Sequence, residues 1–301
     1  MRYQHLIVLL SIFVLTACQI SSESLPPEFD KTKIGTIESD VTYCTMNGVP
    51  LKMDIYYPST IQRQWPLVLY VHGGGWGAGD KKEIGFIDIP ALQKAGILTV
   101  SVDYRLAPQY KFPAMIEDVK CAVRYLRAHA EKYNIDPERF AAIGGSAGGH
   151  LVALLGVTDK AAGFDVGEYA DYSSRVQAVV SISGLADLAQ PFTMQLFFDR
   201  MFVFGVNDPY DPIFLRASPV NYITPDDPPF LLVHGELDTT VPIKQSVILY
   251  RHLQRAGIYT DLVTVKNADH IFLPVGKGPI EPTTEEINSM IMSFLKDHLL
   301  K

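Results

Sequence analysis

The sequence lacks the features that mark several classes of protein. Its 301 residues hold no CxxC pair, no HExxH motif and no other Cys/His spacing typical of a metal site, so we expect no metal and no cofactor. The formal net charge is −7, and no cluster of Lys and Arg is interleaved with aromatic residues, which argues against a nucleic-acid partner. No Ser/Gly-rich linker, charge block or repeat divides the chain. We therefore expect one folded domain that acts on a small or neutral molecule.

Long apolar runs are also absent, and the N-terminal run from Leu6 to Leu15 is too short to cross a bilayer, which takes roughly 20 apolar residues. It follows an early arginine and ends in small residues, which predicts a secretory signal peptide over residues 1–17. The sequence LTAC, ending at Cys18, resembles a bacterial lipobox, in which the cysteine becomes the lipid-bearing first residue of the mature protein. An ordinary signal peptide with a chance cysteine is the alternative. We expect a protein of the bacterial cell envelope, lipid-anchored at Cys18 and facing an extracytoplasmic compartment.

Cysteine is scarce, with three in the chain. If Cys18 carries lipid, Cys44 and Cys121 remain in a compartment that permits disulfides. Cys44 lies in a strand-like stretch and Cys121 on an expected helix, which favours two separate buried thiols over a bond between them. Residues 18–38 are expected to be a polar tether, and residues 39–301 the folded domain.

Short apolar runs follow an alternating hairpin-like stretch at Ser39–Tyr57, which turns at Asn47-Gly48. Runs without polar alternation suit strands covered on both faces of a parallel sheet. Helical periodicity separates several of them and predicts helices at about 113–132 and 242–256 and in the last segment, which opens with a Thr283–Glu286 capping pattern. The sequence therefore predicts an α/β fold with a mostly parallel, doubly wound sheet. The expected strands are 66–71, 97–102, 140–145, 176–183, 229–235 and 260–266.

A candidate nucleophile, Ser146, lies in the sequence GGSAGG between an expected strand and an expected helix. This G-x-S-x-G pattern forms a sharp turn in which small residues at 144 and 148 leave room for the serine hydroxyl to project outward. The amides that begin the next helix would favour negative charge developing beside it. The alternative is a glycine-rich turn with an incidental serine.

A serine hydroxyl needs a base and an orienting carboxylate to become a nucleophile. His270 follows the last expected strand and is the preferred base, whereas the glycine after His234 suggests a structural turn there. Asp238 follows the preceding strand and gives the chain order Ser, Asp, His, with Asp187 as its rival. The neighbouring carboxylates Glu236 and Asp269 are expected to be solvated loop charges, and His5, His129, His252 and His298 to have no catalytic part.

The stretch HGGGWGAGD, from His72 to Asp80, places three glycines directly after an expected buried strand. Attack on a carbonyl creates an oxyanion, and backbone N–H groups free of β-carbons can approach it closely. The amide of Ala147, just after the nucleophile, would supply the facing donor.

Five motifs in order, HGGGW, VDYRLAP, GGSAGGHL, HGELDTTVP and DH, together resemble the α/β-hydrolase superfamily over most of the chain after about Thr42. The chain is similar to hormone-sensitive-lipase-like esterases and to bacterial acetyl/feruloyl esterases. The resemblance implies an α/β-hydrolase fold, with Gly74, Gly75 and Ala147 as the oxyanion donors. Gly145 departs from the Asp that many hormone-sensitive-lipase relatives carry there, which favours the acetyl/feruloyl group.

An insertion between Ala186 and Pro229 is rich in large apolar side chains. It is expected either to form a small cap that lines an acyl or aromatic pocket or to pack as core. Trp76, Phe197 and Phe198 are the candidate substrate-binding residues. The other large side chains of the insertion are Phe192, Met194, Met201 and Phe202.

These observations predict a serine carboxylesterase that hydrolyses short-chain acyl esters, including acetyl or feruloyl esters of carbohydrates, through an acyl-enzyme. A formamidase or a peptidase with the same triad is the alternative, although the length leaves no room for the β-propeller of prolyl oligopeptidases. An inactive surface-anchored binding protein is the remaining hypothesis.

Overall fold

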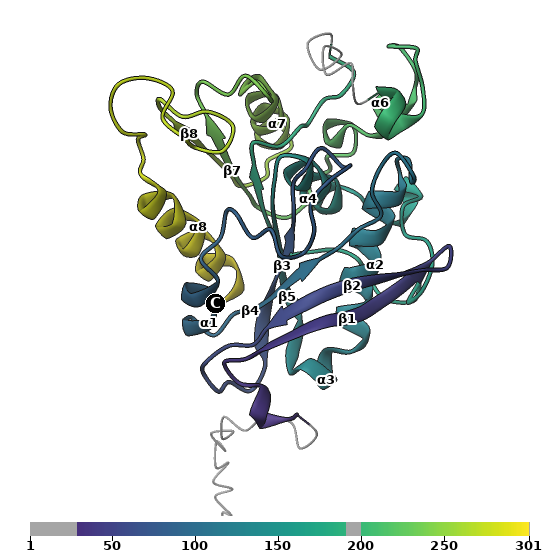
Figure 1. Ribbon diagram of the computed structural model, residues 1–301, viewed down its shortest axis with the longest axis vertical. Coiled ribbons are helices and arrows are strands. Elements are labelled where there is room, and N and C mark those ends of the chain that lie inside the picture. The colour runs from purple at the N-terminus through teal and green to yellow at the C-terminus, as the bar shows by residue number, and fades with distance from the viewer. Residues whose placement is uncertain (1–28, 191–199, 301) are drawn as a thin grey trace, which may run out of the picture.

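The computed structural model describes residues 29–190 and 200–300. An eight-stranded sheet crosses the molecule in the order β1-β2-β4-β3-β5-β6-β7-β8 (Figure 1). Strands β1 and β2 form the predicted antiparallel hairpin, β2 pairs antiparallel with β4, and all further pairs are parallel. The strands are β1 (Ile37–Met46), β2 (Val49–Tyr56), β3 (Trp65–Val71), β4 (Leu98–Val102), β5 (Ile135–Gly145), β6 (Ala178–Ile182), β7 (Phe230–Gly235) and β8 (Thr260–Val265).

Helices cover both faces of the sheet (Figure 1), which confirms the doubly wound architecture. Helices α1 and α8 pack on one face, and α2, α4 and α7 pack on the other. The α-helices are α1 (Ile89–Lys94), α2 (Ala114–Ala128), α3 (Ala130–Tyr133), α4 (Ala147–Val157), α6 (Ile213–Arg216), α7 (Lys244–Arg255) and α8 (Thr284–Leu299). Short 3-10 helices are η1 (Lys31–Lys33), η2 (Lys160–Ala162) and η5 (Pro219–Asn221), and η4 (Arg200–Phe204) is a π-helical turn.

Strand β3 shows why the apolar runs have no polar alternation. Leu67, Leu69 and Val71 belong to the core on the α2 face, and Val68 and Tyr70 belong to the core on the α8 face. Successive side chains of a strand point to opposite faces, so a strand covered on both faces must be apolar throughout.

Helix boundaries follow local chemistry. Thr283 and Glu286 form the predicted capping box at the start of α8. The segment expected as one helix over 113–132 is divided at His129 into α2 and α3. No helix among the described residues is long and apolar enough to cross a membrane.

The expectation of two separate thiols at Cys44 and Cys121 is wrong, because the structure joins them in a disulfide. Strand β1 is the edge strand of the sheet and packs across α2, which brings the two Cα atoms to 6.5 Å, within the range that a disulfide spans. The bond fastens the hairpin to the helix.

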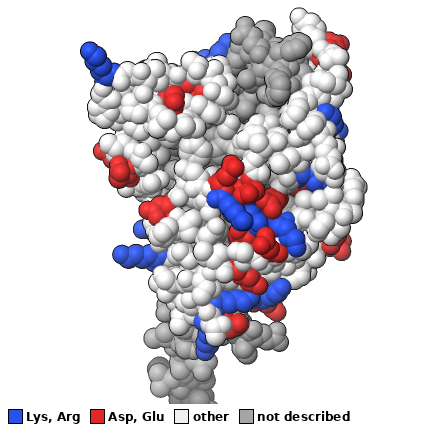
Figure 2. Space-filling view, viewed as in Figure 1, with Lys and Arg blue, Asp and Glu red and all other residues white. Residues whose placement is uncertain are grey.

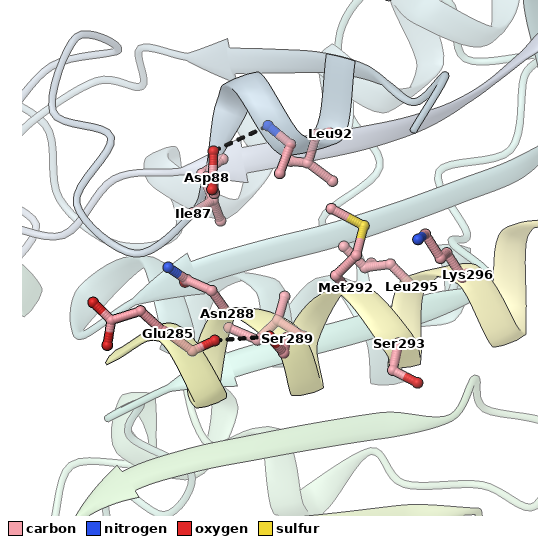
Figure 3. A pocket seen from close by; sticks show the side chains of 12 residues that line it. Ile87, Asp88, Leu92, Glu285, Asn288, Ser289, Met292, Ser293, Leu295 and Lys296 are labelled. Carbon is pink, nitrogen blue, oxygen red and sulfur yellow. Dashed lines mark hydrogen bonds between the residues drawn. The ribbon is translucent and has the colours of Figure 1, made fainter. Parts of the chain in front are cut away.

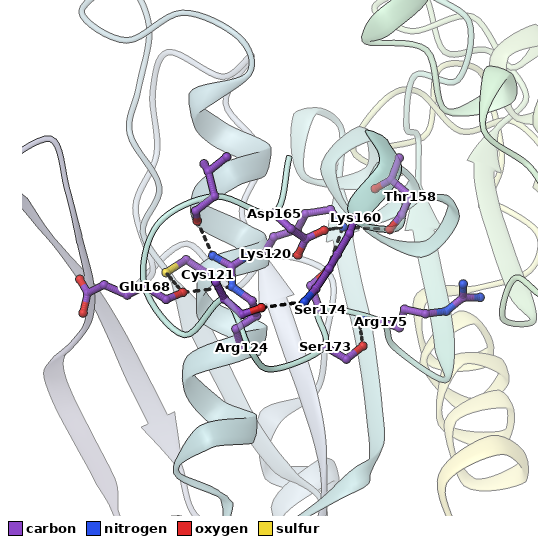
Figure 4. Close-up of polar contacts among 12 residues, drawn as sticks. Lys120, Cys121, Arg124, Thr158, Lys160, Asp165, Glu168, Ser173, Ser174 and Arg175 are labelled. Atoms are coloured by element: carbon purple, nitrogen blue, oxygen red, sulfur yellow. Dashed lines mark hydrogen bonds and ion pairs between the residues drawn. The ribbon is translucent and has the colours of Figure 1, made fainter. Parts of the chain in front are cut away.

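Next to Cys121, α2 carries buried cations that hold the loop between α4 and β6 (Figure 4). Lys120 Nζ and Arg124 Nη1 both pair with Asp165, at 2.9 and 3.0 Å. Lys120 also donates to the carbonyl of Thr158 and the hydroxyl of Ser174. Because buried charges are tolerated only when they are paired and hydrogen-bonded, we interpret this cluster as structural.

Replacing both cysteines, as Cys44→Ser with Cys121→Ser, is expected to lower the free energy of unfolding by about 2–5 kcal/mol. The bond closes a loop of 77 residues, for which the chain-entropy model gives about 4.5 kcal/mol. Urea unfolding with and without reductant measures the loss. Reductant should lower the midpoint of the parent and leave that of the double variant unchanged, whereas a parent insensitive to reductant would contradict the prediction.

Lys and Arg side chains are interleaved with Asp and Glu on the face shown in Figure 2. One such group lies between the hairpin and the loop after β3, where Lys81 pairs with Asp40 at 2.8 Å and lies 3.8 Å from both Asp54 and Asp103. A mixed face of this kind is not a footprint for a polyanion.

In the described part of the insertion between 186 and 229, a few apolar side chains pack as core. Val203 and Phe204 are buried, Phe202 packs against them, and Met201 is exposed. The backbone N–H of Phe112 donates to the carbonyl of Val203, which ties η4 to the start of α2. Phe192, Met194, Phe197 and Phe198 lie outside the described residues.

Candidate active site

Ser146 lies on the turn between β5 and α4, with φ 54° and ψ −120°. Only glycine fits at positions 144 and 148 of this turn. A Cβ at Gly144 would come within 2.6 Å of the backbone of Gly148, and a Cβ at Gly148 would lie 2.1 Å from the carbonyl oxygen of Val71. The strained conformation aims the serine side chain outward at the carboxyl edge of the sheet.

His270 lies on the loop between β8 and α8, at the same edge of the sheet. Gly235, at the end of β7, allows this loop to pass close by, since a Cβ there would lie 2.2 Å from the carbonyl oxygen of Asp269. The carboxylate of Asp269 accepts the backbone N–H groups of Ile271 and Leu273, so it organises the loop.

The structure brings Ser146, His270 and Asp238 into one hydrogen-bonded chain. His270 Nε2 lies 2.9 Å from Ser146 Oγ, and His270 Nδ1 lies 2.7 Å from Asp238 Oδ2. An ionised carboxylate at Asp238 requires the proton on Nδ1, which leaves Nε2 as the acceptor for the serine hydroxyl. This arrangement can remove the serine proton during attack and return it later.

Asp238 is buried, and its Oδ1 accepts the backbone N–H groups of Thr240 and Val241, each at 2.8 Å. Burial alone raises the pKa of this carboxyl, but hydrogen bonds from His234, His270 and Val241 together hold the pKa well below its usual range. The group is therefore charged at neutral pH. The rival acid, Asp187, instead accepts the N–H of Ala189 and the amide of Gln190.

His234 contacts the catalytic carboxylate, a role that the sequence did not reveal because the glycine after it suggested a structural turn. It is fully buried, and its Nε2 lies 2.8 Å from the carbonyl of Val241 and 3.2 Å from Asp238 Oδ2. Its Nδ1 lies 2.7 Å from Ser246 Oγ, whose hydroxyl donates to it. The carbonyl requires the proton on Nε2, so His234 presents an N–H group to the same carboxylate oxygen that His270 contacts.

The glycine run forms a loop over the nucleophile. A Cβ at Gly73 would lie 3.1 Å from the carbonyl of Gly145, and Gly74 and Gly75 have φ of +92° and +58°. Among the described residues, no acceptor receives the backbone N–H of Gly74, Gly75 or Ala147. These three donors are therefore available to a bound oxygen atom.

Two buried aromatic side chains hold this loop. Tyr104, from the VDYRLAP motif, donates to the carbonyls of His72 and Gly73 at 3.1 and 3.0 Å. The His72 ring stacks on Tyr104 at 4.2 Å, and its Nδ1 donates to the carbonyl of Gly73. Burial lowers the pKa of His72, so the ring is neutral and adds no cation beside the site.

The prediction that Trp76 contacts substrate is not supported, because the structure places its ring beside the site in the core. Trp76 is 4% exposed and donates from Nε1 to His150 Nδ1 at 3.2 Å. His150 is fully buried on α4, directly behind the nucleophile turn, and burial lowers its pKa to about 4. A neutral His150 can accept the indole proton and still donate to the carbonyl of Ala217 at 2.7 Å. The pair anchors the glycine loop to α4.

Phe86 explains the glycine at 145. A Cβ at Gly145 would lie 2.3 Å from the Phe86 ring, so a larger side chain there would displace it. The same ring meets Phe272 edge to face at 5.7 Å. Phe86 thus connects the nucleophile turn to the loop that carries His270.

A cavity of about 530 Å³ opens on Ser146 and His270. Its wall includes the three glycines of the loop. The other lining residues are Tyr70, Glu83, Ile84, Gly85, Phe86, Thr240 and Ile271. A second groove, of about 550 Å³, lies between α1 and α8 (Figure 3). The second groove is formed by mixed polar and apolar side chains such as Asp88, Asn288 and Met292, and neither Ser146 nor His270 lines it.

Known protein families and structures resemble this chain in sequence and in fold. The model of the BD-FAE family matches residues 53–253, which is most of the chain. The chain belongs to the BD-FAE family. The matched segment includes the glycine loop, the nucleophile turn and Asp238, and it ends before His270.

Curated relatives of this BD-FAE chain carry names of ester hydrolases. It is 36% identical to Esterase LipC of Mycobacterium tuberculosis over 188 residues, which cover 60% of this chain and 46% of LipC. It is 29% identical to the ethyl acetate hydrolase of Pseudomonas putida, over 87% of this chain and 83% of that protein. The chain spans about half the length of LipC and of the two mycobacterial esterases that match next, LipM and LipQ.

A solved structure described as a truncated form of a carbohydrate esterase from gut microbiota superposes with a TM-score of 0.74. It is 28% identical to this BD-FAE chain, and the match covers 90% of this chain and 99% of that one. The predicted α/β-hydrolase fold and the resemblance to esterases are thereby confirmed.

Proposed function

We propose that this protein is a serine carboxylesterase that hydrolyses short-chain acyl esters through an acyl-enzyme. The observation that carries the proposal is the hydrogen-bonded chain from Ser146 through His270 to Asp238, of which Ser146 and His270 line an open cavity. The esterase relatives support it.

In the first step, Ser146 Oγ attacks the ester carbonyl while its proton passes to His270 Nε2. Asp238 stabilises the imidazolium that forms and holds the ring in the required tautomer. The tetrahedral intermediate collapses when His270 returns the proton to the leaving alcohol, and an acyl ester remains on Ser146. A water molecule, deprotonated by the same nitrogen, then releases the acid.

The negative oxygen of each tetrahedral intermediate needs donors that are already in place. We assign this role to the backbone N–H groups of Gly74, Gly75 and Ala147, which have no acceptor among the described residues. Loss of one such donor costs roughly 3–4 kcal/mol of barrier in comparable sites. Backbone donors also leave the cavity wall free of side chains at this point.

Nitrophenol release from p-nitrophenyl acetate tests the proposal. A well-folded protein that does not hydrolyse this activated ester would favour a formamidase, a peptidase with the same triad or an inactive binding protein instead. Acetyl and feruloyl groups on carbohydrates are the substrates to screen next, and the carbohydrate esterase with a similar structure supports that choice.

We also propose that the protein is anchored in the cell envelope by lipid at Cys18, outside the cytoplasm. The disulfide between Cys44 and Cys121 supports this, because such bonds persist in oxidising compartments. Expressed in a bacterium, the parent is expected in the membrane fraction and to take up radiolabelled palmitate, and Cys18→Ser is expected to do neither. A Cys18→Ser variant that remains membrane-bound and labelled would show that another residue carries the anchor.

A further inference from the structure

We propose that His234 is a positioning residue of the triad, which holds the Asp238 carboxylate in line with His270. The inference rests on the proposed esterase function and adds to its machinery a side chain that does not touch the substrate. His234 is fully buried and is not among the residues that line the cavity over Ser146. Any effect of His234 on the reaction must therefore pass through Asp238.

His234 has a firmer support than the residue it contacts. It is the next-to-last residue of β7, which pairs in parallel with β6 on one side and β8 on the other. Asp238 instead lies on the loop that follows β7. Side chains placed on strands are held more precisely than side chains placed on loops. His234 thus offers the catalytic carboxylate a fixed point of attachment.

Ser246, on α7, sets the orientation and the tautomer of the His234 ring. Its hydroxyl is buried and donates to His234 Nδ1 at 2.7 Å. A ring that accepts at Nδ1 carries its proton on Nε2. The helix therefore fixes which nitrogen of His234 presents a hydrogen to its neighbours.

That hydrogen reaches both oxygens of the carboxylate, one directly and one through a peptide group. Nε2 lies 3.2 Å from Asp238 Oδ2. Nε2 also donates to the carbonyl of Val241 at 2.8 Å, and the N–H of the same Val241 donates to Asp238 Oδ1 at 2.8 Å. His234 therefore fixes the carboxylate and also the residue whose amide holds it.

Burial makes this support necessary. The side chains of His234 and Asp238 are both fully buried, and a buried carboxylate is tolerated only when its oxygens are well hydrogen-bonded. Burial raises the pKa of Asp238, and the contact with His234, followed by that with His270, lowers the pKa below its usual range. Without the His234 N–H, Oδ2 would depend on His270, and the carboxylate could turn away from the geometry that orients the base.

Two amide variants of the full chain separate the contacts of His234. The amide of glutamine extends to about the position of Nε2 and keeps an N–H toward Val241 and Asp238, whereas the amide of asparagine reaches only toward Ser246. His234→Asn is expected to lower kcat for p-nitrophenyl acetate by about 10–100-fold with KM within about twofold, the loss that a small misplacement of a catalytic group causes. His234→Gln should stay within about threefold of the parent, because it keeps the donor.

Proton NMR adds a readout that a merely structural role would not move. The proton between His270 Nδ1 and Asp238 should give a low-field resonance, as expected for a short hydrogen bond to a carboxylate, and Asp238→Asn identifies it by its loss. We expect His234→Asn to displace or broaden this resonance and His234→Gln to restore it. His252→Asn makes the same change at an exposed histidine on α7 and should alter neither kcat nor the resonance.

Urea unfolding shows whether each variant folds. If His234→Asn does not, Ser246→Ala takes its place, because it removes only the hydroxyl that orients the ring. It should lower kcat by about 2–10-fold, the range for loss of one hydrogen bond, and displace the resonance.

A folded His234→Asn with the kcat and the resonance of the parent would overturn the positioning role and leave the esterase function intact. Equal losses of kcat in the two amide variants, with the resonance unmoved, would overturn it as well. A folded parent that is inactive on p-nitrophenyl acetate would overturn the esterase function instead, and the resonance would still decide whether His234 positions Asp238.

Discussion

Ser146→Ala is expected to lower kcat for p-nitrophenyl acetate by about 10⁴–10⁶-fold, as removal of the nucleophile does in other serine triads. The methyl group cannot form the acyl-enzyme, and the serine hydroxyl is the only group on the turn that contacts His270 Nε2 among the described residues. The glycine donors and the cavity remain, so a small residual rate above that of water is expected. KM should change much less than kcat.

The fold of this variant should be unchanged, because Ser146 makes its structural contact through its backbone. Its N–H donates to the carbonyl of Ile182 at 2.8 Å, and alanine keeps that bond. Ser289→Ala, which removes an exposed hydroxyl on α8, is the matched control and should retain full activity. If Ser146→Ala is folded and as active as the parent, the nucleophile lies elsewhere.

The strands of the sheet were predictable because the apolar composition of a buried strand can be recognised within its own few residues. The buried runs at 66–71 and 229–235 became β3 and β7 within one residue at each end, since a strand covered on both faces must be apolar throughout. The division of the 113–132 helix at His129 was not predicted. Asn134 ends α3 in the left-handed conformation and joins it to β5, a boundary that apolar periodicity alone does not reveal.

The disulfide could not be derived from the sequence, because pairing depends on which element crosses which. Strand β1 lies against α2 because the hairpin forms the edge of the sheet, and the 76 residues between Cys44 and Cys121 do not reveal that arrangement. The position of the Trp76 ring could not be predicted for a related reason. Its acceptor, His150, is 74 residues away, and a tryptophan beside a glycine loop reads equally well as a pocket wall or as an anchor.

The candidate site was predictable where a motif fixes the backbone, as at Ser146, and where strand order brings loops together, as at Asp238 and His270. The contact of His234 with Asp238 was not predictable, because it depends on how side chains meet across a buried turn. Burial of a histidine within four residues of the acid was the available clue.

Asp238→Asn is expected to lower kcat by about 10⁴-fold with little change in KM, the loss seen when the acid of such a triad becomes an amide. The reason is that the two oxygens of this carboxylate have different partners. Oδ1 receives the N–H groups of Thr240 and Val241, and Oδ2 faces the ring nitrogens of His270 and His234. An asparagine that keeps its oxygen toward the two amides must direct its NH₂ group at both histidines.

That NH₂ group donates to His270 Nδ1 and so forces the ring proton onto Nε2, which then points at Ser146 and cannot accept its hydrogen. In this orientation the NH₂ group also faces the N–H of His234, and two donors cannot bond to each other. The opposite orientation would turn the oxygen toward the histidines, but it would lose the hydrogen bonds from Thr240 and Val241. Asp187→Asn is the matched control. The Asp187 carboxylate accepts hydrogen bonds from Ala189 and Gln190, so this substitution should leave kcat unchanged. If Asp187→Asn loses activity while Asp238→Asn retains it, the acid that orients His270 has been misassigned.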